Sequence, residues 1–244
     1  MNPHLDFLLS AVYDGADLHP EHLADLRKSG LTDETIQAQK IRSAPPDMID
    51  RLLGFHAPNV RSAYVLPFAD PRGGWFDHTK LKVFSDDGTA DSIRGDHVEQ
   101  PRRERWRYNG GARKYLGRRA APPRLFFPLA TLDRALRGDE PIYLIEGEKK
   151  SLSVAQLGLP AVGLESVWGW HVRGSRELLP DFDDVGLAGR VVNVVPDSDY
   201  RTNPAIERAI RRLAAALNAR GATPRLVVVP AGFKGIDDFL AATP

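Results

Sequence analysis

Carboxylate side chains stand directly after two apolar runs of the sequence. Glu146 follows residues 142–145, whereas Asp197 and Asp199 follow residues 191–195. Residues 142–145 are all apolar and residues 191–195 are apolar except for Asn193, and runs of this kind are typical of buried parallel strands. Functional sites of parallel sheets lie at the carboxyl ends of the strands, so we expect these carboxylates to face one cleft.

The spacing of these acids indicates metal chemistry. Alternate residues of an extended segment point to the same side, so Asp197 and Asp199 would project together. Carboxylates that close repel one another unless a cation lies between them, and oxygen ligands suit Mg²⁺ or Mn²⁺. A divalent metal held by Glu146, Asp197 and Asp199 would serve phosphoryl transfer. The alternative is structural: Glu146 would cap the next helix, and residues 197–199 would form a polar turn.

A third segment adds a lysine and a carboxylate to this set. Lys234 lies in a loop just before Gly235, and Asp237 follows it. A lysine in a glycine-flanked loop would meet a phosphate, and Asp237 would complete the site. The alternative is an ordinary helix start with acidic residues in its first turn.

The elements that must position these residues alternate along the second half of the chain. Strands are expected at residues 125–127, 142–145, 161–164, 191–195 and 226–229, and helices at 131–137, 149–157, 205–219 and 236–242. Strands that alternate with helices predict a parallel sheet with right-handed crossovers.

The first half of the chain has a different pattern. One helix is expected at residues 19–30, a second begins after its N-cap residue Thr32, and a third is expected at residues 47–54. Strands are expected at residues 63–68 and 81–84. Residues 1–18 are weakly patterned and are expected to form a frayed or docking terminus.

The most basic stretch spans residues 101–124 and contains one acid, Glu104. Three aromatic residues, Trp106, Tyr108 and Tyr115, are interleaved with the basic ones. Glycines within the stretch, Gly117 among them, predict a loop. Basic side chains neutralise phosphates, and aromatic rings stack on unpaired bases, so the stretch is expected to bind nucleic acid. The alternative is a solvated loop. The residues assigned to nucleic acid or nucleotide here are Arg103, Arg105, Arg107, Arg113, Lys114, Tyr115, Arg118 and Arg119.

Composition excludes several classes of protein and site. The 244 residues include no cysteine, which excludes disulfides and thiolate zinc sites, so no zinc is expected. No apolar run approaches about 18 residues, so no membrane span is expected. Trp168 and Trp170 flank a glycine and are expected to wedge a loop against the sheet edge, with base stacking as the alternative.

The order of these motifs resembles a known family. A strand-ending Glu146-Gly147 followed one βαβ unit later by residues 197–199 resembles the TOPRIM domain that DnaG-type primases, topoisomerases and some nucleases share. Upstream, residues 64–74 resemble the strand and turn that precede this domain in primases, and residues 113–117 resemble their Lys-Tyr segment.

The resemblance implies an α/β fold: a TOPRIM domain with a central parallel sheet flanked by helices, preceded by a smaller mixed α+β basic subdomain. It divides the chain into a helical lead-in at residues 1–60, the basic subdomain at 61–138 and the TOPRIM domain at 139–244. It implies the catalytic core of a phage or plasmid primase-like protein that acts in DNA replication in the cytoplasm. This core would use Mg²⁺ or Mn²⁺ to make primers on single-stranded DNA from nucleoside triphosphates, with a helicase or another replication protein as candidate partner.

Two departures from the primase pattern keep other functions open. Lys150 stands where primases usually have an acid, and it would either weaken metal binding or contact phosphate. The second departure is that neither a zinc ribbon before the core nor a helicase after it is expected. A metal-dependent nuclease would use the same acids, and a catalytically silent nucleic-acid-binding module would result if Lys150 disables the site.

Overall fold

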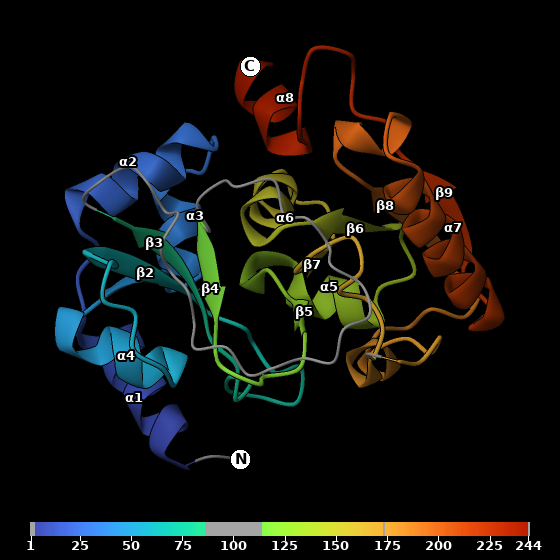
Figure 1. Ribbon diagram of the computed structural model, residues 1–244. Coiled ribbons are helices and arrows are strands. Elements are labelled where there is room, and N and C mark those ends of the chain that lie inside the picture. The colour runs from blue at the N-terminus through green and yellow to red at the C-terminus, as the bar shows by residue number, and fades with distance from the viewer. Residues whose placement is uncertain (1–2, 86–113, 173, 244) are drawn as a thin grey trace. The chain divides into compact units, whose positions relative to one another are not determined.

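The computed structural model describes residues 3–85, 114–172 and 174–243 of the chain (Figure 1). The chain divides into two compact units, and each contains one sheet. The first unit comprises Met1–His22, Ile41–Pro67 and Asp77–Ala121, and the second comprises Leu23–Lys40, Phe68–Phe76 and Pro122–Pro244.

The first unit contains a four-stranded antiparallel sheet in the order β1-β2-β3-β4. Its strands are β1 (Arg42–Ala44), β2 (Ser62–Leu66), β3 (Lys80–Phe84) and β4 (Tyr115–Gly117). Its helices are α1 (Pro3–Gly15), the 3-10 helix η1 (Pro46–Met48) and α4 (Ile49–Leu53), and α2 (Pro20–Lys28) begins in this unit and continues into the second.

Residues 1–18 were expected to form a frayed or docking terminus, and helix α1 docks against β1 and α4, so the structure shows the second of these alternatives. Leu5, Leu8, Leu9 and Val12 are buried, with at most 2% of each side chain exposed. These positions recur at the spacing of one helix face. Packing against β1 and α4 stabilises a helix whose thirteen residues would be marginal alone.

The second unit contains a five-stranded sheet in the order β5-β7-β6-β8-β9, in which only β5 runs antiparallel to its neighbour. Its strands are β5 (Leu125–Phe126), β6 (Ile142–Glu146), β7 (Ala161–Leu164), β8 (Val191–Val195) and β9 (Thr223–Leu226). Its α-helices are α3 (Asp33–Ala38), α5 (Leu132–Arg137), α6 (Glu148–Ala155), α7 (Pro204–Ala219) and α8 (Ile236–Ala242), and its 3-10 helices are η3 (Leu129–Thr131), η4 (Pro180–Asp184) and η5 (Ser198–Arg201). The predicted parallel α/β sheet is confirmed.

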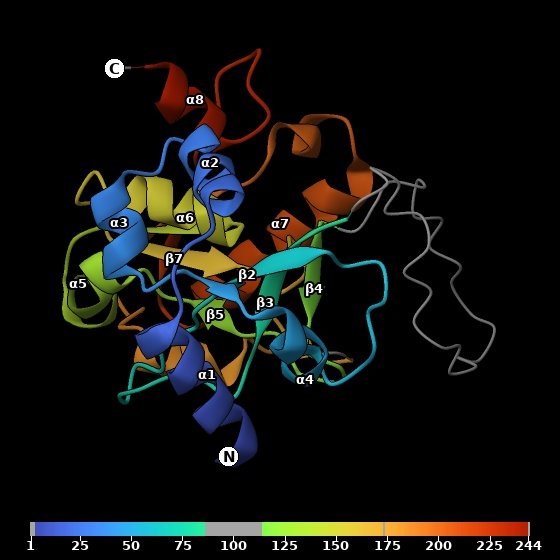
Figure 2. The ribbon, with the colours of Figure 1, turned by 90° about the vertical axis from the view of Figure 1, so that its left-hand side faces the viewer.

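Helices cover both faces of this second sheet. Ile145 of β6 lies in a core cluster with residues of α6 and α8, and α6 packs against β6 and β7 (Figure 2). Its neighbour Leu144 faces the other way, toward Ile210 and Leu213 of α7. Because alternate residues of a strand point to opposite faces, Glu146 shares the face of Leu144 and lies on the side covered by α7.

Two element predictions are wrong in detail. The last strand was expected at residues 226–229, but β9 spans Thr223–Leu226. The sequence did not indicate this position, because β9 is an edge strand that carries Pro224 and Arg225 and so lacks the apolar run of a buried strand. Within the basic stretch, Tyr115–Gly117 forms β4 and pairs with β3 although a loop was expected. Among the described residues, no helix is both long and apolar enough to cross a membrane.

Candidate functional site

The register of the second sheet brings the predicted acids to one edge. Strands β6 and β8 are parallel neighbours, with Ile145 paired to Val195. Glu146 therefore ends β6 beside the point where β8 ends, and Asp197 follows within two residues. This meeting of strand ends is what the acid spacing predicted.

Gly147 makes the turn between Glu146 and α6 possible. Its φ of 103° and ψ of 141° belong to a region that residues with a Cβ avoid, and its N–H donates to the Leu164 carbonyl at 2.8 Å. Gly147 is also the N-cap of α6, and no side chain caps this helix. Glu146 is thus left to point away from the helix start.

Glu146 has an environment that disfavours a lone negative charge. Its Oε2 atom is buried and has no hydrogen-bond partner among the described residues. Burial raises the pKa of Glu146, and the charges of Asp197 and Asp199 raise it further, whereas Lys150 and a backbone hydrogen bond from Val167 lower it. The three predicted carboxylates therefore interact electrostatically, and a nearby cation would stabilise the ionised form of Glu146.

Lys150 supplies one cation to this cluster. Its Nζ forms an ion pair with Asp197 Oδ1, and only 20% of the Lys150 side chain and 14% of the Asp197 side chain are exposed. Its stem passes Gly235 so closely that a Cβ at Gly235 would lie 2.8 Å from Lys150 Cε. Lys150 also lowers the pKa of Asp237, which burial raises. Lys150 thus connects the segment after β8 to the start of α8.

The segment around Lys234 joins the site through its backbone. The Lys234 carbonyl accepts a hydrogen bond from Ser198 N–H at 2.9 Å, while the Lys234 side chain is exposed. Asp237 is 9% exposed, and its Oδ1 atom is buried without a hydrogen-bond partner among the described residues. Glu146, Lys150, Asp197 and Asp237 are therefore grouped, with Lys234 at the margin.

Asp199 differs from the extended arrangement that its spacing suggested. Asp197 has extended backbone, but residues Ser198–Arg201 form the 3-10 helix η5, so the two aspartates do not alternate along a strand. Asp199 is exposed, yet its charge still raises the pKa of Glu146. The acids do not act as helix caps, since no side chain caps α6 or η5. The cap of α7 is Asn203, whose side chain accepts from Ala205 N–H at 3.0 Å.

The donor set suits a hard divalent cation, although the side chains as they stand do not enclose one. In the described parts of the chain, no group of three or more His, Asp or Glu residues is arranged to hold a metal ion. The buried oxygens of Glu146 and Asp237 that lack partners are nevertheless the kind of ligand that Mg²⁺ and Mn²⁺ take. Binding would require Asp197 to exchange part of its interaction with Lys150 for the metal.

The basic residues predicted to bind nucleic acid belong to the first unit or lie outside the described residues. Arg103, Arg105, Arg107 and Arg113 are outside the described ranges. Lys114 and the Arg119 side chain are exposed. Tyr115 lies 5.6 Å from the Lys80 ammonium, and Arg118 donates to the carbonyls of Arg51 and Leu52 at 3.2 and 3.0 Å. Arg118 therefore holds the end of α4 with at least part of its guanidinium.

One ion pair beside the site was missed from the sequence. Lys149 Nζ lies 3.0 Å from Asp25 Oδ2, and both side chains are largely buried. The pair connects α2 to the first turn of α6, next to Lys150. Since 124 residues separate the partners, no local pattern could have indicated it.

Comparison with known proteins relates the chain to primases through its fold. A family model described as "Domain of unknown function (DUF3854)" matches residues 136–244, and no curated protein matches the chain. The solved Aquifex aeolicus primase, comprising zinc-binding and RNA polymerase domains, superposes with a TM-score of 0.64 at 15% identity over 98% of this chain. The chain spans 58% of that structure's length.

Two further structures give the same result. A DnaG catalytic core matches 98% of this chain and 74% of its own length, with a TM-score of 0.61 and 19% identity. A DnaG primase catalytic domain bound to single-stranded DNA matches 99% of this chain and 76% of its own, with a TM-score of 0.59 and 17% identity. The two sheets, one of them mostly parallel, thus form the fold of the primase RNA-polymerase core.

Proposed function

We propose that this chain is a primase-like nucleotidyltransferase core that synthesises short primers on single-stranded DNA from nucleoside triphosphates. The likeness of its fold to primase catalytic cores supports the class of protein. The order of Glu146, Gly147, Asp197 and Asp199 supports a TOPRIM-type second unit. The Glu-Gly-Glu-Lys-Lys sequence at residues 146–150 supports a place among phage and plasmid primase-like proteins.

The observation that carries this proposal is the buried, unpartnered carboxylate oxygen of Glu146, a residue whose pKa the charges of Asp197 and Asp199 raise. A buried carboxylate oxygen without a partner destabilises the folded protein unless a cation or a hydrogen-bond donor binds it. Glu146, Asp197 and Asp199 would hold Mg²⁺ or Mn²⁺, which when bound polarises phosphoryl oxygens and offsets the charge that develops on them.

The remaining residues of the site have roles that follow from their charge and position. Lys150 and Lys234 would contact phosphate oxygens of the nucleotide, and Asp237 would hold Lys150 in place. The exposed Lys114 and Arg119, with the other basic residues of the stretch, would contact phosphates of the template strand.

One observation favours a second candidate, a nucleic-acid-binding module without catalytic activity. Lys150 already neutralises Asp197, so the acidic cluster is stabilised in part without any metal. In that case DNA binding would survive removal of divalent metal, and substitution of the acids would leave it unchanged.

A primer-synthesis assay tests the proposal. The protein is incubated with single-stranded DNA, labelled nucleoside triphosphates and Mg²⁺ or Mn²⁺, beside the Asp197→Asn, Asp199→Asn double variant. Asp133→Asn is the matched control, because the Asp133 side chain is 84% exposed on α5. New short oligomers in the parent and the control that are lost in the double variant would support the primase.

Other outcomes identify the alternatives. Degraded template that depends on the same two aspartates would identify a nuclease that uses the same acids. DNA binding that persists in EDTA, with neither product nor degradation, would identify the silent binding module.

A further inference from the structure

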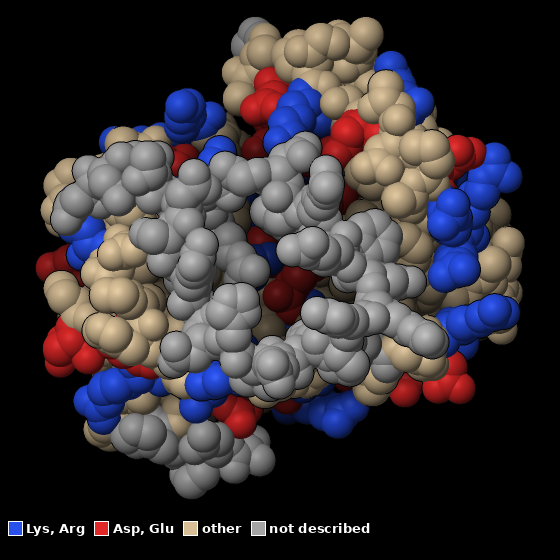
Figure 3. All heavy atoms as spheres, viewed as in Figure 1, with Lys and Arg blue, Asp and Glu red and all other residues tan. Residues whose placement is uncertain are grey.

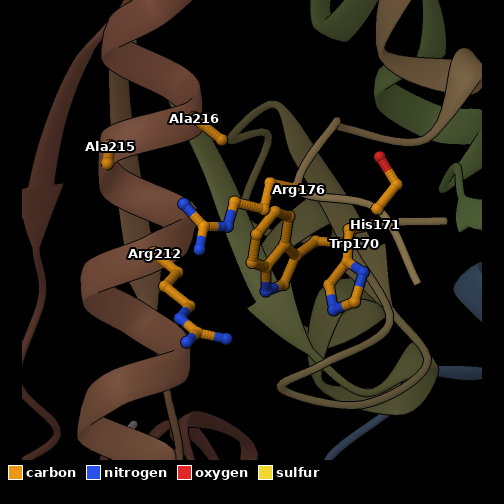
Figure 4. Close-up of a pocket in the computed structure, with 7 residues that line it drawn as sticks. Trp170, His171, Arg176, Arg212, Ala215 and Ala216 are labelled. Atoms are coloured by element: carbon orange, nitrogen blue, oxygen red, sulfur yellow. The ribbon is translucent and has the colours of Figure 1, made fainter. Parts of the chain in front are cut away.

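A cavity of about 340 Å³ lies in the second unit, beside α7 and the segment that follows β7. Its volume is at the lower end of the range for small-molecule sites. From the segment after β7 it is lined by Trp170, His171, Ser175 and Arg176 (Figure 4). From α7 it is lined by Arg212 and by two small residues, Ala215 and Ala216, which leave the space open.

The cavity has two cationic walls. Arg176 and Arg212 are exposed, and neither forms an ion pair within the parts of the chain that the structure describes. Figure 4 shows Arg176 reaching in from one side and Arg212 from α7, with the Trp170 ring beside them. Two guanidinium groups that border one space repel each other, and an anion between them would remove that repulsion.

Trp170 adds an unused hydrogen-bond donor to the same wall. Its side chain is 2% exposed, and its Nε1 atom is buried without an acceptor among the described residues. A buried indole N–H normally has an acceptor, because an unpaired buried donor destabilises the folded protein. A ligand oxygen would supply that acceptor if a small tilt of the ring brought Nε1 to the surface of the cavity.

His171 adds an imidazole to the wall, and Trp168 lies behind it against Arg212. The His171 ring packs edge-on against Trp170 with ring centroids 4.5 Å apart. His171 Nδ1 donates to the Val172 carbonyl at 2.8 Å, which leaves Nε2 available to a ligand. Arg212 Cζ lies 5.9 Å from the Trp168 ring centroid, so a cation–π contact helps to position its guanidinium.

The surrounding surface would attract an anion to this cavity. Helix α7 carries Arg208, Arg211 and Arg212, and basic side chains gather along it (Figure 3). Arg211 is paired with Glu207, whereas Arg208 and Arg212 have no ion-pair partner among the described residues. Positive potential of this kind raises the local concentration of anionic ligands.

We propose that this cavity is a binding site for a phosphorylated nucleoside. The two guanidinium groups match phosphate oxygens, and the indole and imidazole rings offer a flat wall for a base or sugar. The site is separate from the acidic cluster, since its lining includes none of Glu146, Asp197 or Asp237. The proposed nucleotide site can therefore be tested independently of the primer-synthesis activity.

Titration of the full chain with ADP in EDTA tests this site. EDTA prevents a metal–nucleotide complex from binding at the acidic cluster, and calorimetry gives Kd. The Arg176→Gln, Arg212→Gln double variant should bind about tenfold or more weakly, because two charge-assisted contacts are lost. Both side chains are exposed, so the thermal unfolding curve should stay unchanged. Inorganic phosphate should compete with ADP.

Control variants locate the site. Arg208→Gln removes an exposed charge from the same helix without touching the cavity and should leave Kd unchanged. The Asp197→Asn, Asp199→Asn variant should also bind ADP normally. Trp170→Phe, which removes only the indole N–H and part of the ring, should weaken binding in a protein that still unfolds cooperatively.

Several results would overturn the proposal. Absence of ADP binding at millimolar concentration, or equal binding by the double variant, would remove the site. Equal loss in Arg208→Gln would reduce it to a general effect of positive charge. A 5′-phosphorylated oligonucleotide that binds where free ADP does not would make the cavity part of a strand-binding surface.

Discussion

Lys150 Nζ forms an ion pair with Asp197 Oδ1 across the edge of the parallel sheet, between the first turn of α6 and the segment after β8. Both side chains are largely buried, and the pair lies within the electrostatic field of Glu146. The acidic cluster is thus balanced in part by a lysine of the same chain. Because a divalent metal would compete with Lys150 for Asp197, variants of Lys150 should change how strongly the metal stabilises the protein.

Lys150→Met should destabilise the metal-free protein by about 1–3 kcal/mol, because Asp197 would face Glu146 without its cation. Mg²⁺ or Mn²⁺ should then raise the Tm of the variant more than that of the parent, since the metal replaces the lost charge. Calorimetry in EDTA and in excess metal measures both effects. Lys28→Met, on an exposed side chain, is the control, and equal metal-induced shifts in parent and Lys150→Met would contradict the prediction.

Gly147→Ala should destabilise the protein by about 1–3 kcal/mol, because φ of 103° is unfavourable for a residue with a Cβ. Space is not the cause, since the nearest atom to an added Cβ would be Lys150 Cδ at 3.6 Å. Urea unfolding measures the change. Gly15→Ala, at a position without positive φ and with nothing within 4 Å of its Cβ, should change stability little. A similar loss in both variants would show that backbone strain is not responsible.

Arg190→Met should lower the free energy of unfolding by about 2–4 kcal/mol, because three backbone carbonyls would each lose the hydrogen bond from this guanidinium. The Arg190 guanidinium, in a residue 3% exposed, donates to the carbonyls of Arg134, Ala135 and Glu140 at 2.6, 2.7 and 2.6 Å. Arg190→Lys should recover only part of the loss, since an ammonium lacks the planar fork. Arg137→Met, whose parent side chain is 77% exposed, should be nearly neutral in the same denaturation experiment.

Asp181 should make stability depend on pH in an unusual direction. Its carboxylate pairs with Arg124 at 2.7 Å and accepts from Leu125 N–H at 2.8 Å, yet burial raises its pKa. Because the folded protein then binds the proton more tightly than the unfolded chain, this group's contribution to stability falls as pH rises from about 3.9 through the raised pKa.

Comparison with Asp181→Asn isolates that contribution. The stability of the parent minus that of the variant should be larger near pH 3 than near pH 7, and denaturant unfolding across this range measures the difference. A difference that grows as pH rises would mean that Arg124, rather than burial, dominates the pKa of Asp181.

The positions of Glu146 and Asp197 at strand ends could be predicted from the sequence alone. Each follows a mainly apolar run, and such runs form buried strands because burial of their apolar side chains is favourable. The alternation of strands with helices then predicts a parallel sheet, whose strands end at a common edge. These are local signals, and the structure confirms the strands and the sheet that they imply.

What tertiary structure decided is which distant side chains meet. The ion pair of Lys150 with Asp197 depends on the adjacency of β6 and β8 and on the orientation of α6, and no spacing along the chain encodes these. The same holds for Arg212, which lines one cavity with Trp170 only because α7 lies beside the segment after β7. Buried charge and unpaired donors depend on three-dimensional packing, so only the folded chain reveals them.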